Sequence, residues 1–71
     1  MNESDLQIKL GEKIRLYRMQ KNMTQNGLAI ECEFEKASMS RIEAGKANTT
    51  IRTLCKICNA LDIHIAELFA E

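Results

Sequence analysis

Apolar side chains recur at helical spacing on both sides of a short break within residues 24–45. They stand at i, i+1 and i+4 before the break and at i and i+3 after it, which indicates two short helices that each bury one narrow face. These residues are Leu28, Ala29 and Cys32 in the first helix, and Met39 and Ile42 in the second. Thr24 suits the N-cap of the first helix, and Gly45 suits the left-handed residue that ends the second. We therefore predict two helices joined by a tight corner at Glu33 and Phe34, with the ring of Phe34 filling the corner from inside.

The second of these helices leaves outward a face that is small, polar and cationic. Its members are Lys36, Ala37, Ser40, Arg41 and Ala44. A helix that lies in the major groove of DNA needs such a face, because base edges there are read by hydrogen bonds and by contacts with small apolar groups. The pattern therefore suggests a DNA-reading helix.

Three further stretches also have apolar residues at helical spacing. They are residues 6–21, with Ser4 or Asp5 as the cap, residues 51–61, with Thr49 or Thr50 as the cap, and residues 64–70. Asn22 is expected to end the first of them in a left-handed conformation. The composition, with 45% hydrophobic residues, three Gly, no Pro and few aromatics, describes an all-helical soluble domain. We therefore expect a single all-α domain over residues 1–71, built as a compact helical bundle.

The distribution of charge strengthens the DNA interpretation. The net charge is zero, which by itself argues mildly against a nucleic-acid-binding protein. Residues 36–56, however, hold five basic and one acidic residue (+4), whereas residues 1–35 sum to −1 and residues 57–71 to −3. The positive charge is concentrated on the predicted groove helix and on the segment after it, which favours phosphate binding.

The cysteines and the remaining polar residues indicate neither a metal nor a catalytic site. Cys55 and Cys58 form one C-x-x-C, but only Cys32 and His64 remain as further ligands, and both cysteines occupy apolar positions of a predicted helix. We expect structural thiols, no metal and no cofactor. His64 is expected to have a capping or surface role. The methionines expected to fill the core are Met19, Met23 and Met39.

Several observations bear on compartment and on catalysis. No apolar run approaches the ~20 residues of a membrane span, and the N-terminus lacks the basic-then-apolar order of a signal peptide. Three cysteines are an odd number, which fits a reducing compartment. We expect a cytoplasmic protein without membrane contact. No nucleophile-base spacing, phosphate-cradling glycine loop or pair of carboxylates in an apolar setting is present, so we do not expect an enzyme.

Residues 24–45 resemble the helix-turn-helix of the phage repressor and Cro family, also called the XRE family. The family pattern is T-Q-x-x-L-A, a turn, and a small-residue helix that ends in S-R-I-E-x-G. The matching residues are Thr24, Gln25, Leu28, Ala29, Ser40, Arg41, Ile42, Glu43 and Gly45. The similarity extends from about Leu10 to Phe69. It implies a lambda-repressor-like bundle of about five helices that binds double-stranded DNA as a dimer.

The resemblance also implies roles for individual residues. Base reading would fall to Lys36, Ala37, Ser40 and Arg41. Phosphate contacts would fall to Gln25, Asn26, Ser38, Lys46 and Asn48. Relatives pair an arginine of the first helix with the glutamate of S-R-I-E, so Arg18 and Glu43 are expected to form an ion pair that ties the first helix to the end of the third.

Four positions depart from the family pattern. Glu33 stands where glycine is common, and a non-glycine residue in the left-handed conformation is strained by roughly 1 kcal/mol. Glu35 is a poorer cap than Ser or Thr, and Gly27 within a helix costs about 1 kcal/mol relative to Ala. Thr49 replaces a common proline, so we expect a more mobile loop there. The motif should be retained but locally weak.

Residues 57–70 are the candidate dimerisation region. The last short helix and the residue before it carry more apolar surface than one small helix needs, and the expected contacts are Ile63, Ile65 and Phe69. The alternative is that these side chains close the core of the monomer.

We therefore expect a sequence-specific transcriptional regulator that binds an inverted-repeat operator as a homodimer. Relatives of this size include Cro-like phage repressors and controller proteins of restriction-modification systems, and the sequence does not choose between them. One alternative is an antitoxin that binds both DNA and a toxin protein. The other is a protein-binding module without DNA binding, in which Glu33 and Glu35 would disfavour contact with phosphate.

Overall fold

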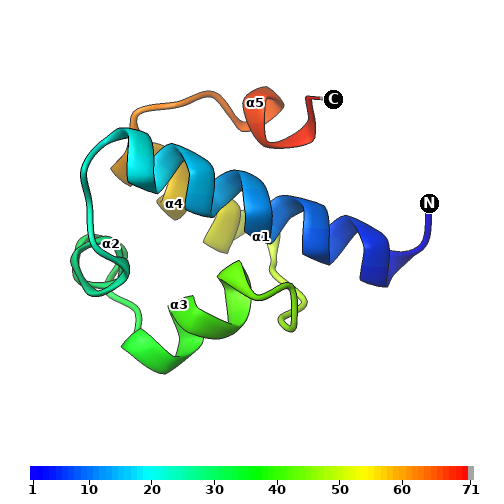
Figure 1. Cartoon of the computed structure of the whole chain (residues 1–71), viewed down its shortest axis with the longest axis horizontal. Coiled ribbons are helices and arrows are strands. Elements are labelled where there is room, and N and C mark those ends of the chain that lie inside the picture. The colour runs from blue at the N-terminus through cyan, green and yellow to red at the C-terminus, as the bar shows by residue number, and fades with distance from the viewer. Residues whose placement is uncertain (71) are drawn as a thin grey trace.

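The computed structural model describes residues 1–70 and contains five helices over that range. In chain order they are α1 (Glu3–Gln20), α2 (Gln25–Cys32), α3 (Lys36–Glu43), α4 (Ile51–Leu61) and α5 (Ile65–Phe69). Figure 1 shows α1 running across the whole molecule, with α2 and α3 on one side of it, α5 on the other and α4 behind. Helix α1 contacts each of the other four. The predicted all-α bundle is confirmed, with α1 as its central element.

The first helix begins earlier than the sequence analysis predicted. The side chain of Asn2 accepts a hydrogen bond of 2.8 Å from the backbone N–H of Asp5, so Asn2 is the N-cap. The expectation that Ser4 or Asp5 would cap this helix is therefore wrong. Acidic residues at Glu3 and Asp5 favour the first turn, because the N-terminus of a helix carries partial positive charge. The prediction failed because the turn between Asn2 and Leu6 contains no apolar residue from which helical spacing could be recognised.

The other helix ends agree closely with their predictions. Thr24 Oγ1 accepts from the N–H of Gly27 at 2.9 Å, and Thr50 Oγ1 accepts from the N–H of Thr53 at 3.2 Å. Asn22 adopts the predicted left-handed conformation, with φ of 57°. At the start of α5 the backbone N–H of His64 donates to a carboxylate oxygen of Glu67 at 2.8 Å, so this exposed histidine is the N-cap.

The core is shared among all five helices. Each contributes at least one large side chain that is fully buried: Ile14, Leu28, Met39, Ile57, Leu61 and Leu68. Phe34, at the corner between α2 and α3, and Met23, in the loop before α2, pack partly buried against this cluster. No helix within residues 1–70 combines the length and hydropathy needed to cross a membrane.

Two residues expected in the core, Cys55 and Met19, lie at the surface instead, and the apolar Ile51 is exposed as well. Ile51 and Cys55 of α4 are exposed, because the buried face of that helix turns toward Ile57. Cys55 lies two residues from Ile57, which is more than half a turn around the helix. Met19 is 55% exposed, since it lies about 140° around α1 from the buried Ile14. The expectation that Cys55 and Met19 are structural core residues is wrong.

Candidate nucleic-acid interface

Helix α3 buries Met39, Ile42 and Glu43 and exposes a small, polar and cationic face. Met39 and Ile42 face the core, and Met39 has no exposed surface. The residues on the outward face are all exposed: Lys36, Ala37, Ser40, Arg41 and Ala44, the last being the C-cap. The structure thus places the four residues assigned to base reading together on one accessible surface of one helix.

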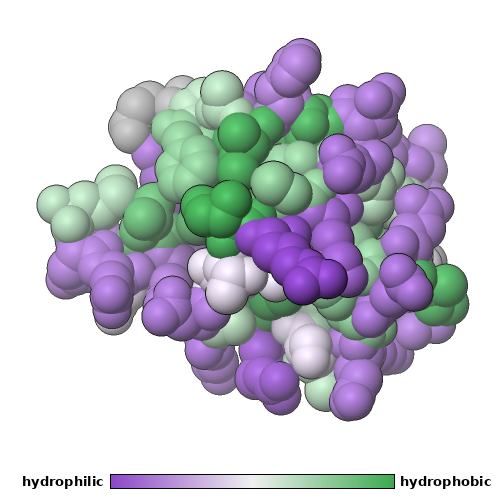
Figure 2. Space-filling model, turned by 180° about the vertical axis from the view of Figure 1, so that it is seen from behind, coloured by the Kyte–Doolittle hydropathy of each residue, from purple (hydrophilic) through white to green (hydrophobic). Residues whose placement is uncertain are grey.

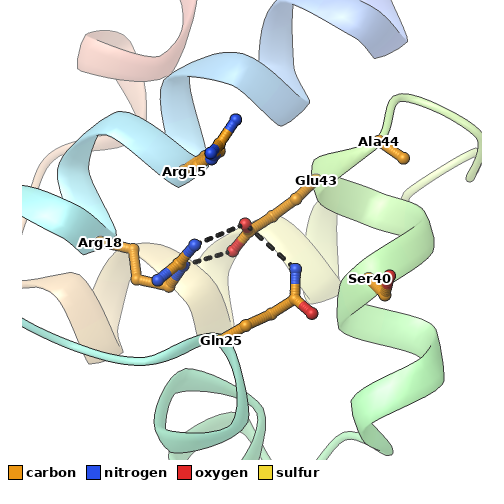
Figure 3. Close-up of a pocket in the computed structure, with 6 residues that line it drawn as sticks. All are labelled: Arg15, Arg18, Gln25, Ser40, Glu43 and Ala44. Atoms are coloured by element: carbon orange, nitrogen blue, oxygen red, sulfur yellow. Dashed lines mark hydrogen bonds and ion pairs between the residues drawn. The ribbon is translucent and has the colours of Figure 1, made fainter.

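A hydrogen-bonded network around Glu43 holds α3 in place. Arg18 Nε donates to Glu43 Oε2 at 2.8 Å, and Arg18 Nη2 donates to Glu43 Oε1 at 3.1 Å. The two side chains are 12% and 4% exposed, so this bidentate pair is largely shielded from water. Arg18 Nη1 also donates to the carbonyl oxygen of Met23 at 2.8 Å, and Gln25 Nε2 donates to Glu43 Oε1 at 3.3 Å. Figure 3 shows how one carboxylate joins α1, α2 and α3.

The residues assigned to phosphate contacts border α3 on two sides. Asn26 at the start of α2 is exposed, as are Lys46 and Asn48 in the loop after α3, whereas Ser38 is half-buried. Gln25 is half-buried, and its amide already donates to Glu43, so only part of that side chain is available for a further contact.

The structure adds one cationic residue that the sequence analysis did not select. Arg15 is exposed and lines a pocket of about 450 Å³ with Arg18, Gln25, Ser40, Glu43 and Ala44. The signal was present in the sequence, because Arg15 lies three residues before Arg18 and so projects from nearly the same side of α1.

The corner between α2 and α3 is made by a left-handed glutamate. Glu33 has φ of 61° and ψ of 37°, and the N–H of Phe34 donates to the carbonyl oxygen of Ala29 at 2.8 Å. Lys56 of α4 places its Nζ 5.7 Å from the centre of the Phe34 ring, which adds a cation–π contact. Glu35 forms no side-chain cap on α3, as its poor capping character predicted.

The cysteines do not assemble into a site. Burial raises the pKa of both the Cys32 and the Cys58 thiol, and Cys32 Sγ lies 3.7 Å from the carbonyl oxygen of Lys56. Cys55 is exposed. Among residues 1–70, no three His, Cys, Asp or Glu side chains gather closely enough to hold a metal ion.

A second surface, made by α5 and the start of α4, exposes several apolar side chains. Ile65 and Phe69 are 36% and 44% exposed, and Ile51 is 67% exposed. Phe69 and Ile51 line a groove of about 160 Å³ that also includes Leu6 of α1. Figure 2, which views the molecule from the side opposite to Figure 1, shows apolar side chains gathered on this face. Ile63, by contrast, packs half-buried against the core.

Comparison with known proteins identifies the family. Residues 9–69 match the model of the helix-turn-helix domain. The chain is 38% identical over 61 residues to the HTH-type transcriptional regulator SlrR of Bacillus subtilis (strain 168), and the match spans 84% of this chain but only 40% of SlrR. It is 32% identical over 69 residues to the control protein C.MunI of Mycoplasma sp, spanning 96% of this chain and 93% of that protein.

A solved structure shares the whole arrangement. The restriction-modification controller protein C.AhdI from Aeromonas hydrophila superimposes with a TM-score of 0.86 at 32% identity, covering 92% of this chain and 97% of the other. The chain therefore belongs to the helix-turn-helix family of the phage repressor and Cro (XRE) type.

Proposed function

We propose that this chain is a sequence-specific transcriptional regulator that acts in the cytoplasm and binds an inverted-repeat operator in double-stranded DNA as a homodimer. The observation that supports this most directly is the exposed cationic face of α3, held at a fixed angle by the buried Arg18–Glu43 pair. Relatives that align over nearly their full length are named control or controller proteins. These matches favour the controller class over a Cro-like phage repressor.

In this proposal α3 lies in the major groove and reads base edges directly. The guanidinium of Arg41 can bind O6 and N7 of guanine in a bidentate manner, which is worth ~1 to 3 kcal/mol of discrimination. Lys36, one turn nearer the start of α3, reaches a second guanine or a phosphate. Ala37 contacts a thymine methyl, and Ser40 lies between these contacts on the same face. Each half-site should therefore contain at least one G·C and one A·T pair.

Contacts to phosphate would set the register of α3 in the groove. Asn26 and Gln25 at the start of α2 lie on one side of α3, where the unpaired amides and the dipole of the helix favour an anion. Lys46 and Asn48 in the loop after α3 lie on the other side of that helix. Ser38, which has a shorter side chain, would contact a phosphate on the same side. These residues would bind all duplexes alike.

The dimer in this proposal forms through the apolar surface of α5. Ile65 and Phe69 supply the contacts, and Ile51 of α4 extends the same surface. Ile63 packs against the core of its own subunit, so we expect it to contribute less to the dimer interface than its sequence position predicted. A twofold axis through this surface would place two α3 helices about 34 Å apart, one turn of DNA.

Selection of bound sequences from a random duplex pool tests the proposal. The expected result is an enriched inverted repeat whose half-site centres lie about 10 base pairs apart, or a multiple of that distance. Arg41→Ala should lose preference at one position of each half-site, whereas Lys46→Ala should bind every sequence more weakly by a similar factor. A pool that stays random, with no binding at low salt, would contradict the proposal and favour a protein-binding module.

A further inference from the structure

Arg15 of α1 lies beside the helix-turn-helix without belonging to it. Its side chain lines the same open pocket as Gln25 of α2 and Ser40 of α3. In Figure 3 Arg15 lies above the Arg18–Glu43 pair, Gln25 below it and Ser40 to the right. The first helix of the chain therefore shares a surface with both helices of the DNA-binding motif.

The pocket carries one unbalanced positive charge. The carboxylate of Glu43 accepts two hydrogen bonds from Arg18 and one from Gln25, so its charge is already matched by the Arg18 guanidinium. Arg15 is exposed, and no carboxylate of residues 1–70 lies within 4.0 Å of its guanidinium. Even Glu12, one turn away on α1, forms no ion pair with it. Arg15 is thus available to an external anion.

We infer that Arg15 binds a phosphate of the DNA backbone, next to the phosphate approached by Gln25 and Asn26. The inference rests on the proposed function and extends the DNA contact from α2 and α3 to α1. A guanidinium can bind two phosphate oxygens at once, which suits a residue at the edge of an open pocket. Such a contact fixes the orientation of the protein on the duplex and carries no sequence information. Arg15 is therefore a positioning residue, distinct from Arg41.

The test is a salt series with two duplexes of equal length, one carrying the selected operator and one of random sequence. Binding constants are measured by fluorescence anisotropy for the wild type, Arg15→Gln, Arg15→Lys and Lys13→Gln. Lys13→Gln is the matched control, because it also removes one positive charge from α1. Lys13 lies about 200° around the helix axis from Arg15. It lines a different groove, with Lys9, Glu12 and Leu16.

Arg15→Gln should make the negative slope of log K against log salt concentration shallower by about 0.9. At 0.15 M salt, it should weaken binding to both duplexes by about fivefold. Arg15→Lys should restore the slope, and Lys13→Gln should leave it unchanged. Thermal melting of Arg15→Gln should coincide with that of the wild type, because the side chain is exposed and forms no ion pair within residues 1–70.

Three results would overturn the inference while leaving the proposed function intact. They are an unchanged slope in Arg15→Gln, an equal loss of slope in Lys13→Gln, and a loss confined to the operator duplex, which would indicate base reading. A wild-type protein that binds neither duplex at low salt would instead contradict the proposed function, and the role of Arg15 with it.

Discussion

Gly11 of α1 lies directly against the C-terminal end of α3, so that a Cβ added at Gly11 would stand 2.6 Å from the carbonyl oxygen of Glu43. The carbonyl oxygen of Ile42 would lie at the same distance. Both obstacles are backbone atoms, which cannot rotate away as a side chain can. The end of α3 is thus held against α1 twice, by close backbone packing at Gly11 and by the ion pair between Arg18 and the Glu43 side chain.

Gly11→Ala should therefore separate α1 from α3 and destabilise the fold. We expect the free energy of unfolding, measured by urea titration, to fall by about 1 to 3 kcal/mol, the usual cost of overpacking. Gly27→Ala is the control, because its Cβ would meet only the Thr24 hydroxyl, at 3.1 Å, and alanine favours the helix. Equal effects of the two substitutions would show that the contact at Gly11 is unimportant.

Glu43→Ala should be the most damaging single change to the polar network. It leaves the largely buried guanidinium of Arg18 without its partner, and breaking a buried pair in this way costs about 3 to 5 kcal/mol. The thermal midpoint should fall far more than for Glu12→Ala, which removes a solvent-facing carboxylate of α1. A midpoint shift no larger than that of Glu12→Ala would contradict the structural role of the pair.

Glu33→Gly should stabilise the protein. Glu33 adopts φ of 61°, where glycine has no steric penalty, so the gain should be about 1 kcal/mol in urea unfolding. Asn22→Gly provides the comparison, since Asn22 has nearly the same φ but asparagine tolerates this conformation better. If Glu33→Gly raises the free energy of unfolding no more than Asn22→Gly does, the glutamate does not strain the corner.

The three thiols should differ in reactivity. Cys55 is exposed, whereas burial raises the pKa of Cys32 and Cys58 and reduces their reactive thiolate fraction. A thiol reagent at neutral pH should label Cys55 first, as mass mapping of the native protein will test. Labelling of all three at one rate would contradict the burial of Cys32 and Cys58.

The same two thiols should make stability depend on pH. Their raised pKa means that the folded protein keeps protons which the unfolded chain loses above about pH 8.5. The folded state is therefore disfavoured as pH rises through this range, and its free energy of unfolding should decline. The decline should be smaller in the Cys32→Ala, Cys58→Ala double variant, measured by urea unfolding from pH 7 to 10.

Phe69→Asp should dissociate the proposed dimer. The ring is 44% exposed, and a charge placed within an apolar interface would be desolvated without a partner. Sedimentation equilibrium should show a monomer, and binding to the operator should weaken. Ile30→Asp is the control, because Ile30 is 66% exposed on α2, away from α5. A dimeric Phe69→Asp variant would place the interface elsewhere.

The part of the fold that could be predicted from sequence is the part whose signals are local. Thr24 caps α2, the T-Q-x-x-L-A and S-R-I-E-x-G patterns located both motif helices, and the resemblance to the family supplied the Arg18–Glu43 contact. The start of α1 could not be predicted, because its first turn is entirely polar and depends on the side chain of Asn2.

Side-chain orientation was less predictable than helix position. The spacing of α4 was consistent with more than one buried face, and only the packing of Ile57 against the core turned Cys55 and Ile51 outward. Arg15 was overlooked because it lies outside the motif, and its proximity to Ser40 depends on how α1 crosses α3. The spacing of Arg15 and Arg18 indicates that they share a side of α1, but that this side faces Ser40 is a result of tertiary packing.

The outward residues of α3 contribute nothing to the hydrophobic core, which that helix reaches only through Met39 and Ile42. Mutations at Lys36, Ala37, Ser40 or Arg41 should therefore be nearly neutral for folding, and in the proposed function they would alter which operator is bound. Gene duplicates of such a protein could diverge in target by a few substitutions, without compensating changes elsewhere in the chain. The same separation makes α3 a suitable helix for libraries that reprogramme DNA recognition.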